Sequence, residues 1–248
     1  MANSPADQEA LIARNRAMLE AALAVIEVAG RAGVRARLLG GLAIAAHLDD
    51  PSRFTHRPFQ DIDFYVPSGE QRRFAPVLSD AGFVAEPRFN ALNGHRRMLF
   101  HGPDYDVDVL VGEFEMCHRI DFRDRVDLDA PTLPVADLLL TKLQIIELNA
   151  KDAADVALLV THHEVRRGHG DHIDLNRLIE VTSSDWGLWR TVTGTAAKVA
   201  TTASPVVRGR LTEIWDVLQA SPKTLGWRTR ARIGERVKWY QEPEEVGR

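Results

Sequence analysis

Three aspartates in two short apolar segments are the residues of this sequence best suited to chemistry. Asp61 and Asp63 flank Ile62, and Asp108 lies in a later segment that alternates aspartate with apolar residues from Asp106 onward. Alternate residues of a strand point to the same face, so Asp61 and Asp63 would project together while Ile62 points to the core. Aspartate is disfavoured in strands and clustered like charges repel, so this arrangement calls for a cation. Hard oxygen ligands suit Mg²⁺, and three carboxylates suit two such ions.

Two adjacent glycines, Gly40 and Gly41, precede an apolar helix expected over Leu42–Leu48. Glycine lets the backbone approach a ligand closely, and the N–H groups at the start of a helix favour an anion. A phosphate next to magnesium is the combination found in a nucleoside triphosphate site. The glycines and the aspartates together therefore predict that the protein binds an NTP.

The helices and strands that must position these residues are predicted from the spacing of apolar residues and from the Gly and Pro residues that interrupt them. Strands and helices mix before residue 121, whereas helices dominate after residue 134. The sequence thus predicts an α+β protein with a catalytic domain over 1–130 and a helical domain over 131–248. Expected helices cover 9–30, 42–48, 70–81, 134–148, 152–160, 175–181, 186–201, 205–218 and 228–240, and expected strands cover 34–39, 61–66, 83–86, 96–101 and 105–111.

Composition excludes several other classes of protein. The chain is 45% hydrophobic and 27% charged with a net charge of -4, so it does not coat nucleic acid through bulk charge. Its single cysteine, Cys117, excludes an intramolecular disulfide and a Cys-rich zinc site. No apolar segment reaches the roughly 20 residues of a membrane span, and the first residues are polar. We therefore expect a cytoplasmic protein without a membrane partner.

The order of these motifs resembles the nucleotidyltransferase superfamily with the DNA-polymerase-beta-type fold. The resemblance rests on Leu39-Gly-Gly-Leu-Ala, on Arg57-Pro-Phe-Gln-Asp-Ile-Asp63 and on Asp108, within residues 34–112. It implies a mixed sheet with flanking helices. It also implies that Asp61, Asp63 and Asp108 are the catalytic residues and the metal ligands.

The same resemblance implies that Gly40, Gly41 and Arg57 bind the nucleotide. Many relatives carry serine where this chain has Gly41, so one hydroxyl that would contact phosphate is missing. An arginine four residues ahead of Asp61 also occurs in antibiotic nucleotidyltransferases, where it would contact phosphate. A loop arginine paired with an acidic neighbour is an equally good interpretation of Arg57.

A second stretch resembles the helical region of AbiEii-like toxin nucleotidyltransferases. It consists of Leu138-Leu-Leu-Thr-Lys142-Leu and Lys151-Asp152-Ala-Ala-Asp155-Val. The resemblance implies that Lys142 contacts the triphosphate and that Asp152 or Asp155 lies at the edge of the cleft. The alternatives are a lysine whose amine reaches solvent from an apolar helix, and an aspartate that stabilises a helix N-terminus.

Other polar residues have simpler interpretations. Asp106 shares the face of Asp108 but lies nearer the start of its strand, so we expect it to be solvated. Asp127 and Asp129 have the spacing of Asp61 and Asp63 and are assigned no role. A zinc site needs a fixed geometry, so a solvated loop is favoured for the cluster His162, His163, His169 and His172.

These observations predict a Mg²⁺-dependent nucleotidyltransferase, with two ions and with Mn²⁺ as an alternative metal. It would move a nucleoside monophosphate from an NTP to an acceptor hydroxyl and release pyrophosphate. Residues 205–240 hold eight Lys/Arg against three Asp/Glu with interleaved tryptophans. A helix face with core tryptophans is one interpretation; the other is a surface that would suit a tRNA 3′ end, as in a toxin with a cognate antitoxin. The acidic segment 104–137 would instead suit a small hydroxylated cation such as an aminoglycoside. The third hypothesis for the function is a non-catalytic nucleotide-binding protein of the same fold.

Overall fold

The computed structural model describes residues 5–48 and 58–242, and the chain forms two compact units. The first unit comprises Met1–Glu113 and Asp121–Leu133, and the second comprises Phe114–Ile120 and Pro134–Arg248. The division expected at 130/131 lies close to the junction after Leu133. The sequence did not predict that the short segment 114–120 belongs to the second unit. The fold is α+β, as the sequence indicates.

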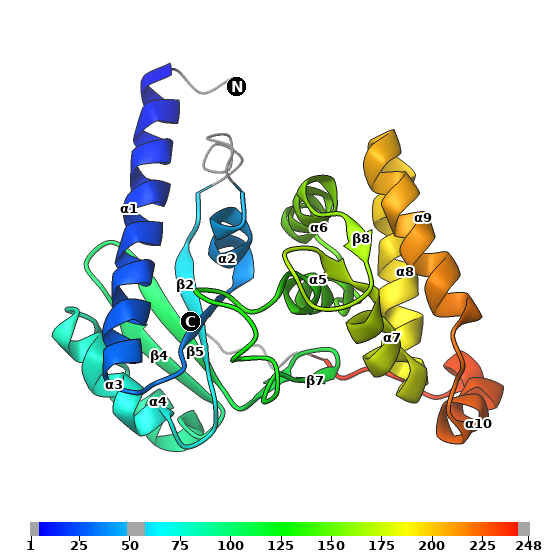
Figure 1. Ribbon diagram of the computed structural model, residues 1–248. Helices are drawn as coiled ribbons and strands as arrows, with labels where there is room; N and C mark the ends of the chain where they lie inside the picture. Colours follow the sequence, from blue (N-terminus) through cyan, green and yellow to red (C-terminus); the bar gives the residue numbers. More distant parts are fainter. Residues whose placement is uncertain (1–4, 49–57, 243–248) are drawn as a thin grey trace. The chain divides into compact units, whose positions relative to one another are not determined.

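A mixed five-stranded sheet is the centre of the first unit (Figure 1). Its strand order is β1-β2-β5-β4-β3, and the central strands β2 and β5 run parallel while the other neighbours are antiparallel. The expected strand over 61–66 is confirmed, and the other four strands are shorter than expected. The strands are β1 (Arg37–Leu39), β2 (Asp61–Val66), β3 (Val84–Ala85), β4 (Arg97–His101) and β5 (Asp106–Val111).

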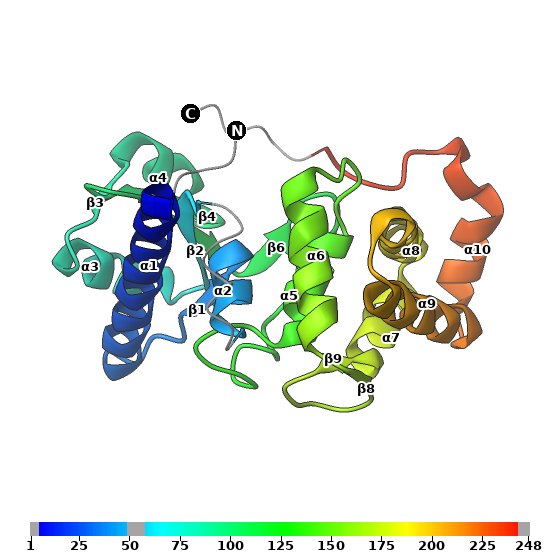
Figure 2. The ribbon, with the colours of Figure 1, turned by 90° about the horizontal axis from the view of Figure 1, so that it is seen from above.

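Helices cover the two faces of this sheet. α1 (Pro5–Arg31) and α3 (Gln71–Asp80) lie against one face, and α2 (Gly40–Ala46) lies on the other (Figure 2). The fully buried rings of Phe64 on β2 and Phe74 on α3 meet edge to face, 5.4 Å apart. Because Phe64 and the aspartates of β2 alternate, the core face and the carboxylate face of the sheet are opposite sides.

The second unit is mainly helical, and all residues of α5 are buried at its centre. Within residues 5–48 and 58–242, every helix is too short or too polar to cross a membrane. Two short strands, β8 (Val165–Arg166) and β9 (Ile173–Asp174), pair in parallel. The helices are α5 (Val135–Leu143), α6 (Ala150–His162), α7 (Leu175–Ser184), α8 (Trp186–Thr202), α9 (Pro205–Ala220), α10 (Leu225–Ile233) and the 3-10 helix η2 (Gly234–Arg236).

Several expected elements differ from the structure for local reasons. The helix expected over 134–148 ends at Leu143, and Asn149 starts a new helix by accepting a hydrogen bond from the Asp152 N–H. The helix expected over 228–240 starts earlier, at Leu225, and ends at Ile233, because Gly234 follows with a φ of 62° that breaks helical geometry. The sequence analysis missed the hairpin of β6 (Glu113–Glu115) and β7 (Arg119–Asp121). It also missed α4 (Pro87–Asn93), although Glu86 caps it and proline is favoured in the first turn.

Candidate functional site

Four aspartates lie on one face of the two central strands. The parallel register of β2 and β5 pairs Asp61 with Asp106 and Asp63 with Asp108. Paired residues of neighbouring strands point to the same face and are about 4.8 Å apart along the hydrogen-bonding direction. The structure therefore brings together all three predicted carboxylate residues and adds Asp106. The alternating partners Ile62 and Val107 are buried on the opposite face.

Gly40 lies directly against one of these aspartates. β1 pairs Leu39 with Asp63, and the chain then turns into α2 at Gly40, which has a φ of +67°. A Cβ atom built on Gly40 would lie 2.0 Å from Asp63 Oδ2. Only glycine fits this position, because both the backbone angle and the close approach exclude a side chain. The predicted pair Gly40 and Gly41 is thus brought to the carboxylate face.

Helix α1 anchors the chain just before Asp61. The fully buried Asn15 accepts a hydrogen bond of 3.1 Å from the backbone N–H of Phe59, and Arg14 donates one of 2.6 Å to the Phe59 carbonyl. These contacts fix the start of β2 and hence the direction of Asp61. Arg57, the expected phosphate contact, lies outside the described residues.

The sequence analysis missed Arg97, which binds the third carboxylate. Its Nε lies 2.8 Å from Asp108 Oδ1 and 3.0 Å from Oδ2, and its terminal nitrogen also contacts Oδ2. The hydrogen bond to Asp108 raises the pKa of Arg97, and the charges of Asp63 and Asp61 raise it further. Because β4 pairs Leu99 with Asp108, Arg97 approaches the carboxylate diagonally from the next strand. Arg97 lies within the strand expected over 96–101. Its partner could not be predicted from the sequence, because the partner depends on which strand lies next to it in the sheet.

Asp106 has a different partner. His101 on β4 is its register partner, and His101 Nδ1 lies 3.0 Å from Asp106 Oδ1. Both side chains are about half exposed, 53% and 52%. Asp106 is therefore accessible to solvent, as expected, but it also belongs to the row of polar groups on the carboxylate face.

Lys142, Asp152 and Asp155 form a separate cluster in the second unit. The Lys142 amine lies 2.8 Å from Asp152 Oδ1 and 2.9 Å from Asp155 Oδ2, and all three side chains are nearly inaccessible. Burial alone would lower the pKa of Lys142, but the charges of Asp155 and Asp152 raise it. The alternative that this amine reaches solvent is wrong. A contact between Lys142 or Asp152 and a triphosphate stays a prediction.

The histidine-containing loop is only partly solvated. His163 is buried, and its Nδ1 lies 3.1 Å from the carbonyl oxygen of Leu159. His172 Nε2 lies 2.8 Å from the carbonyl oxygen of Gly168. The expectation of a solvated loop is therefore wrong for His163, whose ring is used to close the end of α6.

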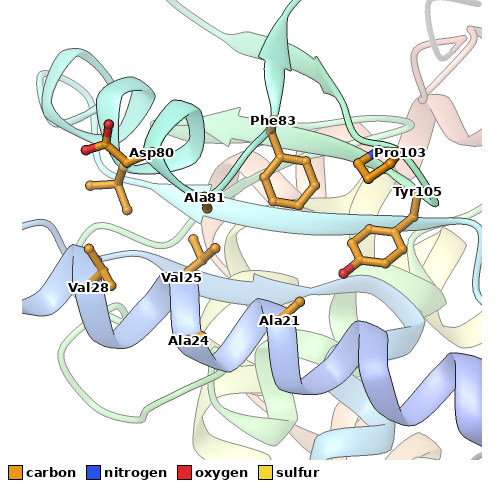
Figure 3. Close-up of a pocket in the computed structure, with 10 residues that line it drawn as sticks. Ala21, Ala24, Val25, Val28, Asp80, Ala81, Phe83, Pro103 and Tyr105 are labelled. Carbon is orange, nitrogen blue, oxygen red and sulfur yellow. The ribbon is translucent and has the colours of Figure 1, made fainter.

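A cavity of about 330 Å³ lies on the core side of the sheet, between α1, α3 and the chain near Tyr105. Figure 3 shows Val25 and Ala21 of α1 on one wall and Phe83 and Tyr105 on another. Its walls are mainly apolar, and Asp80 contributes a carboxylate to the lining. Phosphate chemistry needs clustered charges, so the carboxylate face is the better candidate for an active site.

Comparison with known proteins finds a family model and a distant structural neighbour. The sequence model of a family described as "Uncharacterised nucleotidyltransferase" matches residues 6–193, a range that contains Gly40, the four aspartates and Lys142. No curated protein matches the chain. Among solved structures, it is similar to an antigenic nucleotidyltransferase-like protein from Paracoccidioides brasiliensis. The TM-score is 0.41 and the identity 11%, with 84% of this chain and 94% of that chain covered.

Proposed function

The chain belongs to this uncharacterised nucleotidyltransferase family, and we propose from that premise that it is a metal-dependent enzyme that moves a nucleoside monophosphate from an NTP to an acceptor hydroxyl. The observation that carries the proposal is the face of four aspartates beside Gly40. Carboxylates concentrated on one side of an apolar sheet repel one another, so they are suited to binding cations.

Magnesium fits this donor set because its preferred ligands are carboxylate oxygens. We assign Asp61 and Asp63 to the metal that accompanies the triphosphate and Asp108 to the metal on the side of the attacking hydroxyl, with Mn²⁺ as an alternative ion. When bound, such ions neutralise the developing charge on phosphate and activate the attacking oxygen.

The residues of the chain would mainly bind and orient. Backbone N–H groups at Gly40 and Gly41 would hold phosphate oxygens, since no side chain obstructs their approach. The acceptor oxygen attacks the α-phosphorus, the bond to the bridging oxygen breaks, and pyrophosphate leaves. Asp108 would also help to take the hydroxyl proton. Positioning and charge neutralisation account for most of the catalysis in such reactions.

For the acceptor, we favour the 3′ end of a tRNA over a small cationic molecule. α10 and the residues after it present the exposed cations Arg228, Arg232 and Arg236, and the first two are one helical turn apart. Arginines at such a spacing suit consecutive phosphates of an RNA backbone. A tRNA acceptor would fit an AbiEii-like toxin, which would also have a cognate antitoxin.

The acidic segment 104–137 gives less support to a cationic drug as the acceptor. Many of its carboxylates are already neutralised within the protein, so the attraction that it exerts on a cation is reduced. The pairs are Asp108 with Arg97, Glu115 with Arg119, Asp121 with Arg123, Asp127 with Arg35 and Asp137 with Arg177.

The test incubates the purified protein with each NTP labelled at the α-phosphate, Mg²⁺ and total tRNA. We expect label on tRNA with one preferred NTP, and no label with Asp63→Asn.

Arg228→Glu/Arg232→Glu should reduce labelling of tRNA while NTP affinity stays unchanged, and Arg72→Glu on α3 is the matched control in the first unit. Turnover without tRNA labelling would favour a small acceptor. NTP binding without turnover in any combination would support the non-catalytic alternative.

A further inference from the structure

We propose, resting on the function proposed above, that Arg97 is a positioning residue that holds Asp108 until a divalent cation displaces its guanidinium. The guanidinium thus competes with the metal for the third carboxylate. The competition weakens cation binding at Asp108.

The contact geometry supports this competition. Arg97 reaches both oxygens of Asp108, at 2.8 Å and 3.0 Å from Nε, and its terminal nitrogen also engages Oδ2. Such a forked pair uses the carboxylate directions that a metal would need. A metal on Asp108 must therefore share an oxygen with Arg97 or replace it.

The exposure of the two side chains makes an exchange feasible. The side chain of Arg97 is 34% exposed, whereas that of Asp108 is 15% exposed. Arg97 approaches from the edge of the carboxylate face, so its guanidinium can move toward solvent while Asp108 stays on its central strand. Asp61 and Asp63 lie on the strand beyond Asp108, away from β4. Arg97 thus donates its hydrogen bonds to the third carboxylate, and its charge acts on the other two from a greater distance.

Charge explains the function of such an arrangement. With Arg97 in place, one of the four negative charges on the face is neutralised, which reduces the repulsion before a substrate arrives. A triphosphate adds negative charge and brings its own cation, so the balance then favours a second metal over the arginine. The second metal would therefore bind mainly after the nucleotide.

The experiment measures Mn²⁺ binding to the full-length protein by the electron paramagnetic resonance signal of free Mn²⁺, without nucleotide. Arg97→Met should lower the Kd of the site that contains Asp108 about tenfold, because it removes the competing charge-assisted hydrogen bonds. Arg97→Lys keeps the positive charge but loses the bidentate contact with the carboxylate, and we expect it to lower this Kd about threefold. Arg72→Met is the matched control and should leave the Kd unchanged.

Asp108→Asn tests whether Arg97 affects Mn²⁺ binding through Asp108. In that background, Arg97→Met should no longer tighten Mn²⁺ binding. A wild-type Kd in both Arg97 variants, or equal tightening with and without Asp108, would overturn the proposal. If Arg97→Met does not fold, the Arg97→Lys comparison decides alone. A separate result bears on the proposed function: Mn²⁺ binding that is unaffected by Asp63→Asn would show that the aspartates hold no metal.

Discussion

Two groups of aspartates in this chain are compensated in different ways. Asp108 and Asp106 pair with Arg97 and His101 on a partly exposed sheet face. Asp152 and Asp155 instead enclose a buried lysine. Partly exposed pairs contribute little to stability and leave carboxylate oxygens available, whereas a buried cluster depends on every member. The first group is suited to binding, and the second to holding α5 and α6 together.

We expect Lys142→Met to destabilise the protein by about 3–5 kcal/mol, because it leaves two buried carboxylates without their cation. Denaturant unfolding measures this loss. The exposed Lys151→Met, on the same helix as Asp152, is the matched control and should change stability by less than about 0.5 kcal/mol.

A different result for Lys142→Met would support the contact with the triphosphate that the family resemblance implies for Lys142. In that case the variant keeps the stability of the wild type, while its affinity for a non-hydrolysable NTP analogue falls about ten- to a hundredfold.

The turn from β1 into α2 is the element that couples the glycines to the proposed metal ligands. Leu39 is the last residue of a strand paired with Asp63, and Gly40 is the first residue of a helix. The change of direction takes place at one residue with positive φ, which places the backbone directly on the Asp63 carboxylate. A displacement of this turn would therefore move the proposed metal ligand Asp63 and the backbone proposed to bind phosphate together.

Gly40→Ala should lower stability by about 1–2 kcal/mol through its backbone angle and should also displace Asp63, with weaker Mn²⁺ binding as the result. Gly30→Ala is the matched control, because a Cβ there meets nothing within 4 Å. Gly30 lies in the last turn of α1, where alanine should be neutral or slightly stabilising. Thermal unfolding and Mn²⁺ titration of both variants measure these effects. Undisturbed Mn²⁺ affinity in Gly40→Ala would mean that Asp63 is not a ligand.

At the scale of the whole molecule, the chain enters the second unit before the first is complete. Residues 114–120 belong to the second unit, and the chain returns to the first at Asp121. Gln144 accepts a hydrogen bond from the backbone N–H of His118, and the His118 ring lies 2.7 Å from the Thr191 hydroxyl. The backbone N–H of Gln241 donates to the carbonyl of Cys117. The second unit therefore packs its short segment 114–120 against residues of its long segment 134–248.

We expect these contacts to make stability depend on pH through His118. Burial lowers the pKa of His118 below its usual value of 6.5, and the charge of Asp185 offsets this only in part. The unfolded chain therefore takes up a proton at a higher pH than the folded chain does. The contribution of neutral His118 to the free energy of unfolding should be fully present above about pH 6.5. It should decrease as the pH falls below that value.

Melting curves between pH 7.5 and 5.0 for the wild type and His118→Gln measure this contribution, since glutamine keeps a polar group without titrating. The difference in melting temperature between the two proteins should narrow as the pH falls. His95→Gln, at an exposed histidine of the first unit, is the matched control and should change the melting temperature little. A constant difference between wild type and His118→Gln would contradict the expected protonation linkage.

The sequence by itself determined the features that depend on local backbone geometry. Alternation predicted the strand Asp61–Val66 and the shared face of Asp61 and Asp63, because successive strand residues point to opposite sides. Helical periodicity and glycine punctuation predicted α1 and the helix after Gly40. These signals extend over a few residues, so no distant part of the chain was needed to interpret them.

Only the tertiary structure decided which of these segments are neighbours. Strand order and register place Asp108 beside Asp63 and bring Arg97 onto it, and no local pattern encodes either pairing. The burial of Lys142 between two aspartates likewise depends on how α5 packs on α6. Such contacts are fixed by the packing of the entire core, because register and helix docking are chosen by the apolar surface that they bury together.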